Sequence, residues 1–210
     1  MKLYLYEHCP FCTRARLAFG FKNVPVELSI IMEGDAQTPT QLVGRKVVPI
    51  LQKEDGSHMA ESLDIVHYVD QLGTPMFDGA VDPAIDSWIK DAWPLGLKLF
   101  IPRFTKGDFA ELATPAAREA YRLREEAAFG DLEALMANTP ALLTEMTHKL
   151  NALAPLLQAR HDVDISDIVL WPVLRSLSIV KDLEFPAAVR SYMERIAERS
   201  KVPLLFDQAM

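Results

Sequence analysis

Cysteine, net positive charge and long hydrophobic runs are all scarce in this 210-residue chain. The 22 Lys and Arg residues are outnumbered by 29 Asp and Glu, which gives a net charge of −7. This acidic balance lacks the basic footprint of a nucleic-acid-binding protein. The longest apolar runs are too short to cross a bilayer. We therefore expect no nucleic-acid partner and no membrane partner.

The N-terminal segment lacks the features of a signal peptide. Residues 1–8 contain neither an apolar run nor a small-residue cleavage site. We therefore expect a cytoplasmic protein. In that reducing compartment, a closely spaced cysteine pair indicates catalysis rather than a structural disulfide.

The two cysteines of the chain form one stretch, Cys9-Pro10-Phe11-Cys12, which follows a strand pattern and opens a helical pattern. Pro10 suits the first position of a helix, so Cys9 is predicted at or near the N-cap. There the free backbone N–H groups and the helix dipole favour a thiolate. Cys12 lies one turn further on, where it can attack a mixed disulfide formed on Cys9. Cys9 is therefore predicted to be the nucleophile and Cys12 the resolving thiol.

Two other interpretations of the cysteine pair are half of a zinc site and two inert thiols. A structural zinc site needs two further good ligands. The histidines are scattered without paired spacing: His8, His58, His67, His148 and His161. No metal site is therefore predicted, and redox chemistry is the preferred interpretation.

Other charged residues receive ordinary structural interpretations. His8 is interpreted as exposed polarity at a strand end, and assistance to the Cys9 thiolate by its charge is the alternative. A mixed-charge helix surface in contact with solvent is predicted from Arg118, Arg122 and Arg124 among Glu119, Glu125 and Glu126.

The first 72 residues predict an α/β unit. A strand at residues 2–6, the helix opened by Pro10 and a strand at residues 26–32 form a βαβ unit with a parallel pair. A third strand at 47–51 is followed by a hairpin turn and a short antiparallel strand at 58–60. A helix then begins at Glu61-Ser62 and is closed by Gly73. This order is the thioredoxin-like arrangement.

The rest of the chain predicts helices alone. Residues 73–83 read as a linker, and residues 84–210 as an all-α domain. Helices are predicted at 84–99, 115–138, 142–160, 165–177 and 187–199. A capping box is expected at Asp164 to Asp167.

Two further stretches offer ordinary and functional interpretations. Val48-Pro49 lies within a predicted strand, and by frequency alone a trans proline ending the strand is favoured. A cis bond would leave the backbone of Val48 free to pair with a thiol tripeptide. Glu61-Ser62 at a helix start is most simply an N-cap. Alternatively, Ser62 and the free N–H groups would hold a carboxylate while Glu61 pairs with an ammonium group.

These residues resemble the large, glutathione-transferase-shaped glutaredoxins of the glutaredoxin 2 type. The resemblance covers most of the chain and departs from the family where Phe11 replaces the commoner tyrosine. The matching motifs are residues 8–12, 38–40, 43–44, 48–53, 61–70, 102–104 and 114–118. Residues 202–210 match poorly.

The resemblance implies a thioredoxin-like domain packed on an all-α domain, as in glutathione transferases. It implies Cys9 as nucleophile, Cys12 as its partner and a cis Pro49. The glutathione site that it implies comprises Pro10, Phe11, Val48, Pro49, Glu61 and Ser62. The expected activity is that of a glutathione-dependent thiol–disulfide oxidoreductase. Its expected partners are glutathione and disulfide-bonded or glutathionylated proteins, and we expect a monomer.

Two rival functions use the same scaffold. A glutathione transferase would need the same binding residues but no second cysteine, so Cys12 favours redox chemistry. A non-enzymatic interaction protein would need no reactive pair at all, so the intact Cys9 to Cys12 stretch argues against it.

Overall fold

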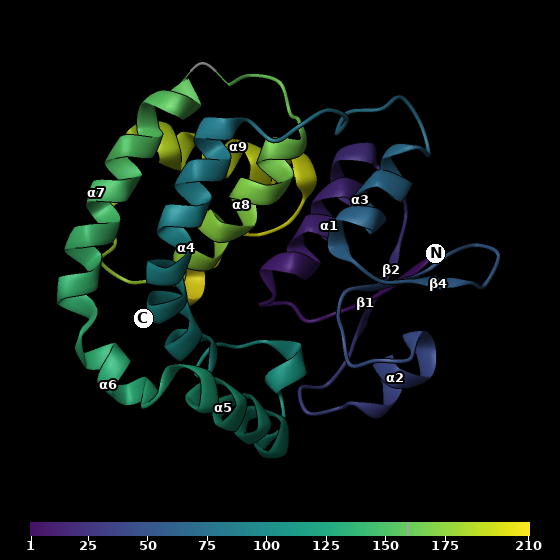
Figure 1. The fold of residues 1–210 in the computed structure, drawn as a ribbon, viewed down its shortest axis with the longest axis horizontal. Coiled ribbons are helices and arrows are strands. Elements are labelled where there is room, and N and C mark those ends of the chain that lie inside the picture. The colour runs from purple at the N-terminus through teal and green to yellow at the C-terminus, as the bar shows by residue number, and fades with distance from the viewer. Residues whose placement is uncertain (159) are drawn as a thin grey trace.

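A mixed four-stranded sheet forms the centre of the N-terminal part of the molecule (Figure 1). Its strand order is β2-β1-β3-β4. β1 (Lys2–Leu5) pairs in parallel with β2 (Glu27–Ile30) and antiparallel with β3 (Ile50–Gln52). β3 pairs antiparallel with β4 (His58–Met59). The structure is a computed structural model that describes residues 1–158 and 160–210.

Three helices accompany this sheet. α1 (Pro10–Lys22) joins β1 to β2 and is followed by Asn23, whose left-handed backbone (φ 50°) forms its C-cap. α2 (Gln37–Val43) lies between β2 and β3. α3 (Ser62–Asp70) follows β4 and packs against α1. The expected thioredoxin-like arrangement is confirmed.

The second part of the chain is helical, as predicted. Its helices are α4 (Pro83–Phe104), the 3-10 turn η1 (Ala110–Leu112), α5 (Pro115–Phe129), α6 (Leu132–Ala137), α7 (Thr139–Gln158), α8 (Ile165–Leu177), α9 (Ala187–Ser200) and the 3-10 turn η2 (Phe206–Gln208). α8 is buried along its whole length, because α4, α9 and α1 all pack against it. The predicted capping box is present at its start, where Asp164 and Asp167 cap each other's backbone. Within the described ranges, no helix is both long and apolar enough to cross a membrane.

Several helix boundaries differ from the sequence prediction, most clearly those of α4 and of the helix expected at 115–138. The single helix expected at 115–138 is interrupted at Gly130, which has a φ of 77°, and Asp131 then caps α6. α4 continues five residues past the predicted end at Leu99 and contains Pro94 and Pro102. Burial of its last turns stabilises helix despite the prolines, because tertiary packing overrides local propensity.

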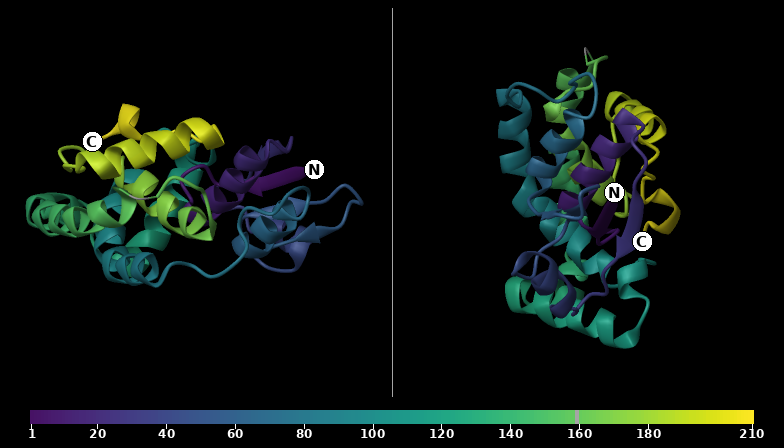
Figure 2. Two further views of the ribbon diagram at one scale, coloured as in Figure 1. Left: turned by 90° about the horizontal axis from the view of Figure 1, so that it is seen from above. Right: turned by 90° about the vertical axis from the view of Figure 1, so that its right-hand side faces the viewer.

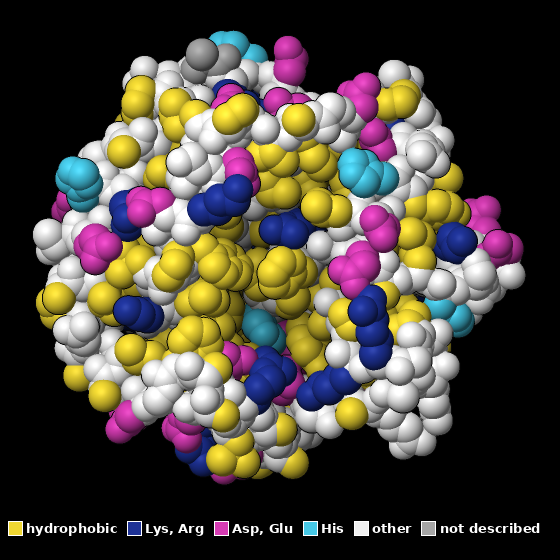
Figure 3. Space-filling model, viewed as in Figure 1, with side chains coloured by type: hydrophobic (Ala, Val, Ile, Leu, Met, Phe, Trp, Pro, Cys, Tyr) yellow, Lys and Arg dark blue, Asp and Glu magenta, His cyan; other side chains and the backbone are white. Residues whose placement is uncertain are grey.

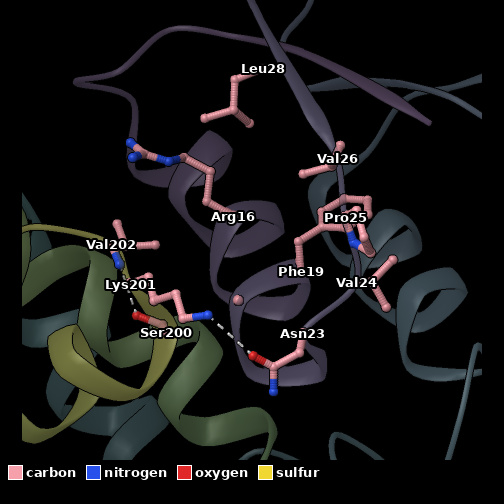
Figure 4. A pocket seen from close by; sticks show the side chains of 11 residues that line it. Arg16, Phe19, Asn23, Val24, Pro25, Val26, Leu28, Ser200, Lys201 and Val202 are labelled. Atoms are coloured by element: carbon pink, nitrogen blue, oxygen red, sulfur yellow. Dashed lines mark hydrogen bonds between the residues drawn. The ribbon is translucent and has the colours of Figure 1, made fainter.

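The two parts of the molecule meet along α1. This helix contacts α8 and α9 of the helical part, and α9 lies beside it in both views of Figure 2. The ends of α1 and α9 and the start of β2 enclose an open cavity of about 420 Å³, lined by residues that include Arg16, Asn23 and Lys201 (Figure 4). Arg175 of α8 also donates hydrogen bonds to the carbonyls of Glu7, at 3.0 Å, and Pro203, at 2.9 Å. The loop before Cys9 is thus held by the helical part.

Candidate active site

Cys9 is the N-cap of α1, as predicted. Its backbone is extended (φ −66°, ψ 122°), Pro10 follows as the first helical residue, and its Sγ accepts a hydrogen bond from the N–H of Cys12 at 3.4 Å. Cys9 is half-buried, whereas Cys12 is fully buried, and both thiols are free. Cys9 is therefore the member of the pair that an external disulfide can reach.

The pKa values of the two thiols are shifted in opposite directions. A hydrogen bond with the side chain of Cys12 lowers the pKa of Cys9 from its ordinary 9 to about 7. The charge of His8 and the backbone N–H groups of Phe11 and Cys12 act in the same direction, against the effect of burial. Burial and the neighbouring Cys9 raise the pKa of Cys12 well above the ordinary value. Near neutral pH, Cys9 is thus the member of the pair with a large thiolate fraction, whereas Cys12 stays a thiol.

His8 is buried, so its interpretation as exposed strand-end polarity was wrong. Its side chain is 5% exposed, and its ring stacks on Tyr6 with centroids 5.7 Å apart. The ring also contacts Phe104, Phe109 and Tyr121 of the helical part, at centroid distances of 5.2, 5.7 and 5.0 Å. Its Nδ1 lies 2.6 Å from Oε1 of Glu111. The residue beside the nucleophile therefore sits in the contact between the two parts.

A cavity of about 400 Å³ opens beside Cys9 between the two parts of the molecule. Hydrophobic side chains surround a hollow in the middle of the face shown in Figure 3. The N-terminal part lines the cavity with Tyr6, His8, Cys9, Pro10, Phe11, Pro39, Lys46, Val47 and Val48, and the helical part with Trp93, Leu97, Phe100, Ile101, Phe104, Tyr121, Arg124 and Glu125. A disulfide that approaches Cys9 therefore meets a mainly apolar wall.

Glu125 does not belong to the solvated helix surface that the sequence predicted, whereas Arg124 is exposed as predicted but also pairs with the other part of the molecule. Arg124 pairs with the buried carboxylate of Glu33 in the N-terminal part and with Glu125. Glu125 is itself buried, and both residues line the cavity. The prediction was wrong here because α5 turns this face toward the sheet-containing part.

The peptide bond between Val48 and Pro49 is cis, as the family resemblance implied and contrary to the commoner geometry. Val48 lines the cavity beside Cys9. Among the residues that the structure describes, none pairs with the backbone N–H or C=O of Val48. Both groups are therefore available to an extended ligand.

No side chain caps the start of α3. The interpretation of Glu61-Ser62 as a simple N-cap was therefore wrong, because it required a side-chain hydrogen bond to the first N–H groups. Glu61 occupies the N-cap position, but its side chain makes no capping hydrogen bond and its backbone is left-handed (φ 70°). Its exposed carboxylate pairs instead with Arg45. Ser62 is the buried first residue of the helix. The first N–H groups of α3 therefore remain open to an anion.

The predicted site residues fall into two groups. Cys9, Pro10, Phe11 and Val48 line the cavity together, and Cys12 lies behind Cys9. Pro49, Glu61 and Ser62 are not among the residues that line it. Sequence reasoning missed Glu111 altogether, since it lies 103 residues from His8 and no local pattern marks it. No group of three metal-ligating side chains occurs within residues 1–158 and 160–210.

Comparison with known proteins gives a consistent picture. The family model of the glutaredoxin 2 C-terminal domain matches residues 84–209, and that of the glutathione S-transferase N-terminal domain matches residues 3–75. The chain is 42% identical to glutaredoxin 2 of Escherichia coli strain K12, over the full length of both chains.

Solved structures extend this comparison. The crystal structure of glutaredoxin 2 from Salmonella typhimurium in complex with glutathione has a TM-score of 0.96 and 39% identity, and the match covers 100% of this chain and 98% of that one. Gtt2 from Saccharomyces cerevisiae matches with a TM-score of 0.58 at 23% identity, over 99% of this chain and 100% of that one. The latter likeness concerns the fold alone.

Proposed function

This chain belongs to the glutaredoxin 2 family and is a glutathione-dependent thiol–disulfide oxidoreductase, and we propose that Cys9 is its nucleophile and Cys12 its resolving thiol. One observation carries the assignment. The reachable sulfur of Cys9 lies at the N-terminus of α1 with a pKa of about 7, while Cys12 is buried with a raised pKa. A thiolate is both the better nucleophile at neutral pH and, later, the better leaving group.

The reaction then runs in two halves. The Cys9 thiolate attacks one sulfur of a disulfide, so that a Cys9 mixed disulfide forms and the other sulfur leaves as a thiolate, which takes up a proton. Cys12 loses its proton and attacks the Sγ of Cys9, which releases the second thiol of the substrate and closes the Cys9–Cys12 disulfide. Two molecules of glutathione reduce this disulfide through a mixed disulfide at Cys9 and leave as glutathione disulfide.

Glutathione is placed by three elements of the site. The free N–H groups of α3 and the Ser62 hydroxyl receive its γ-glutamyl carboxylate, and Glu61 exchanges Arg45 for its ammonium group. The unpaired backbone of Val48 pairs with the cysteinyl residue, whose sulfur then points to Cys9. Pro10, Phe11 and Pro49 supply the surrounding wall. The glutathione complex of the Salmonella relative supports this assignment.

Disulfide-bonded and glutathionylated proteins are the proposed substrates, and the proposed setting is the cytoplasm. Phe11, next to Cys9, is 43% exposed, which provides an apolar contact at the rim of the site for a protein surface. We propose a monomer, following the resemblance to the glutaredoxin 2 family.

Two variants test the assignment of the cysteines. Cys9→Ser is expected to abolish reduction of both a glutathione mixed disulfide and a protein disulfide. Cys12→Ser is expected to retain the first activity and lose the second, because only the second needs a resolving thiol. Full activity of Cys9→Ser in either assay would end the proposal. An assay of glutathione transfer to an aromatic electrophile, on the same preparations, tests the rival function of a glutathione transferase.

A further inference from the structure

Glu111 is a fully buried carboxylate of the helical part whose hydrogen bonds reach across to the N-terminal part. It lies in η1 and is 0% exposed. Its Oε1 accepts a hydrogen bond from the backbone N–H of His8 at 2.9 Å and lies 2.6 Å from the Nδ1 of the same residue. A carboxylate in such a position is costly unless it is paired. Both contacts of this oxygen go to the residue directly before the nucleophile.

The chemistry of Glu111 fixes the proton on His8. Burial opposes ionisation, but hydrogen bonds and charge from His8 outweigh it and hold the pKa of Glu111 below its usual value. An ionised carboxylate only accepts hydrogen bonds, so Nδ1 of His8 must carry the proton between them. Among the described residues, Nε2 has no hydrogen-bond partner, and His8 lines the cavity beside Cys9.

The surroundings of the His8 ring hold it in one orientation. Four aromatic rings pack around it, with centroids 5.0 to 5.7 Å away: Tyr6, Phe104, Phe109 and Tyr121. Such packing leaves the side chain little freedom to rotate. The hydrogen bond to Glu111 therefore selects the tautomer of a ring whose position is already set.

We propose that Glu111 is a positioning residue for the thiol chemistry: its carboxylate at Nδ1 holds the His8 ring in place and favours positive charge on it, and that charge stabilises the Cys9 thiolate. This inference rests on the proposed role of Cys9 as nucleophile. It assigns to the helical part a direct role in the reactivity of a cysteine that belongs to the other part.

Other titratable groups also face the cluster formed by Cys9, His8 and Glu111, and they remain unchanged in the test below. They come from every element packed against it: Tyr6 and Glu7 after β1, Cys12, Arg14 and Arg16 from α1, Tyr121 from α5 and Arg175 from α8. Arg16 and Arg175 add positive charge near Glu111, which favours its ionised form.

The test compares Glu111→Gln with Glu33→Gln. Glutamine has nearly the shape of glutamate and lacks its charge, so it can accept from Nδ1 or donate to it and no longer selects one tautomer. Glu33 is a matched control, because it is also a buried carboxylate between the two parts, with one oxygen that has no partner among the described residues. Its carboxylate pairs with Arg124 and Lys46 and makes no contact with His8 among the described residues.

Two readouts on the full chain are used. The first is the rate at which iodoacetamide alkylates Cys9 between pH 5 and 9, with the modified residue identified by mass spectrometry. Glu111→Gln is expected to react about threefold more slowly at pH 6, which corresponds to a rise of about half a pKa unit. The second is the ¹⁵N signal of His8 in histidine-labelled protein, which is expected to lose its exclusive Nδ1–H form. Glu33→Gln is expected to change neither readout.

Three results would overturn the inference. They are an unchanged alkylation profile in Glu111→Gln, an equal change in Glu33→Gln, or an unaltered His8 tautomer. If Glu111→Gln does not fold, His8→Asn replaces it, since asparagine keeps an N–H toward Glu111 and removes the ring. An unchanged alkylation rate in His8→Asn would then refute the inference. Alkylation at a residue other than Cys9 would instead refute the proposed function.

Discussion

The backbone of Gly20 in α1 lies directly against the carbonyl group of Ser200 at the end of α9. A Cβ atom at residue 20 would lie 1.9 Å from that oxygen and 2.7 Å from its carbon. Neither neighbour is a flexible side chain that can move aside. This close approach lets α1 and α9 pack together, and it explains why glycine stands in the last turn of a helix that glycine otherwise weakens.

We expect Gly20→Ala to destabilise the protein by about 1–3 kcal/mol because of this overlap. The sign is informative, since the same change at an unhindered helix position stabilises by about 1 kcal/mol. Urea unfolding followed by circular dichroism measures the difference. Gly73→Ala is the control, because its nearest contact would be the tip of the Lys22 side chain at 3.7 Å. Equal stability of Gly20→Ala and the wild type would contradict the packing described here.

The reaction of Cys9 with iodoacetamide is expected to follow a titration with a midpoint near pH 7. The hydrogen bond with the Cys12 side chain lowers the pKa of this thiol from its ordinary 9 to about 7, so the thiolate fraction is high above pH 7 and falls as the pH drops through 7. Cys12, buried and with a raised pKa, is expected to stay unmodified over the same range. A midpoint near 9 would show that Cys9 is an ordinary thiol.

The same shift predicts a pH dependence of stability. Cys9 binds its proton more weakly in the folded state than in the unfolded state, so the thiolate adds stability that is present above the unfolded pKa near 9 and is lost as the pH falls through about 7. The stability of the reduced wild type relative to Cys9→Ser should therefore increase from pH 6 to pH 9. Parallel unfolding curves at both pH values measure it. A constant difference would argue against the lowered pKa.

Ser62→Ala is expected to weaken glutathione binding about tenfold, the effect of losing one hydrogen bond to a charged group. Calorimetry in a Cys9→Ser background measures affinity without disulfide exchange. Ser191→Ala changes an exposed serine of α9 and serves as the control. Unaltered affinity in Ser62→Ala would remove the start of α3 from the binding site.

Asp70 ties the segment after α3 to the N-terminal part. Its carboxylate accepts hydrogen bonds from the N–H groups of Met76, at 2.8 Å, and Phe77, at 3.0 Å, and pairs with Lys22. Removing it leaves buried donors without partners, so Asp70→Ala should cost about 2–4 kcal/mol. Asp64→Ala, an exposed change in the same helix, should cost at most about 1 kcal/mol. Thermal unfolding of both variants provides the comparison.

Features with short-range causes were predictable from the sequence. The position of Cys9 at the start of α1 follows from Pro10 and from the strand-to-helix change around it, and α8 begins and ends where its capping box and apolar period place it. The thioredoxin-like order was readable because each of its elements carries its own periodicity. The cis bond before Pro49 was different, since frequency alone favoured trans and only the family resemblance pointed to cis.

Features that depend on contacts between distant residues were not predictable. His8 looked like polarity at a strand end because nothing near it in the sequence shows that Glu111 and four aromatic rings enclose it. Glu125 looked like solvated helix surface for the same reason, and nothing near Arg124 in the sequence shows its ion pair with Glu33. The break at Gly130 was missed because an isolated glycine in a periodic pattern does not by itself end a helix.

The hydrogen bonds from Arg175 to Glu7 and from His8 to Glu111 mean that the segment leading into the reactive thiol is anchored from outside its own domain. The thioredoxin-like part should therefore not be treated as a redox domain that is independent of the helical part. Cutting the chain after residue 75 would keep the strands and both cysteines but remove the anchors on Glu7 and His8. Engineering of this scaffold should therefore retain both halves and vary the cavity between them.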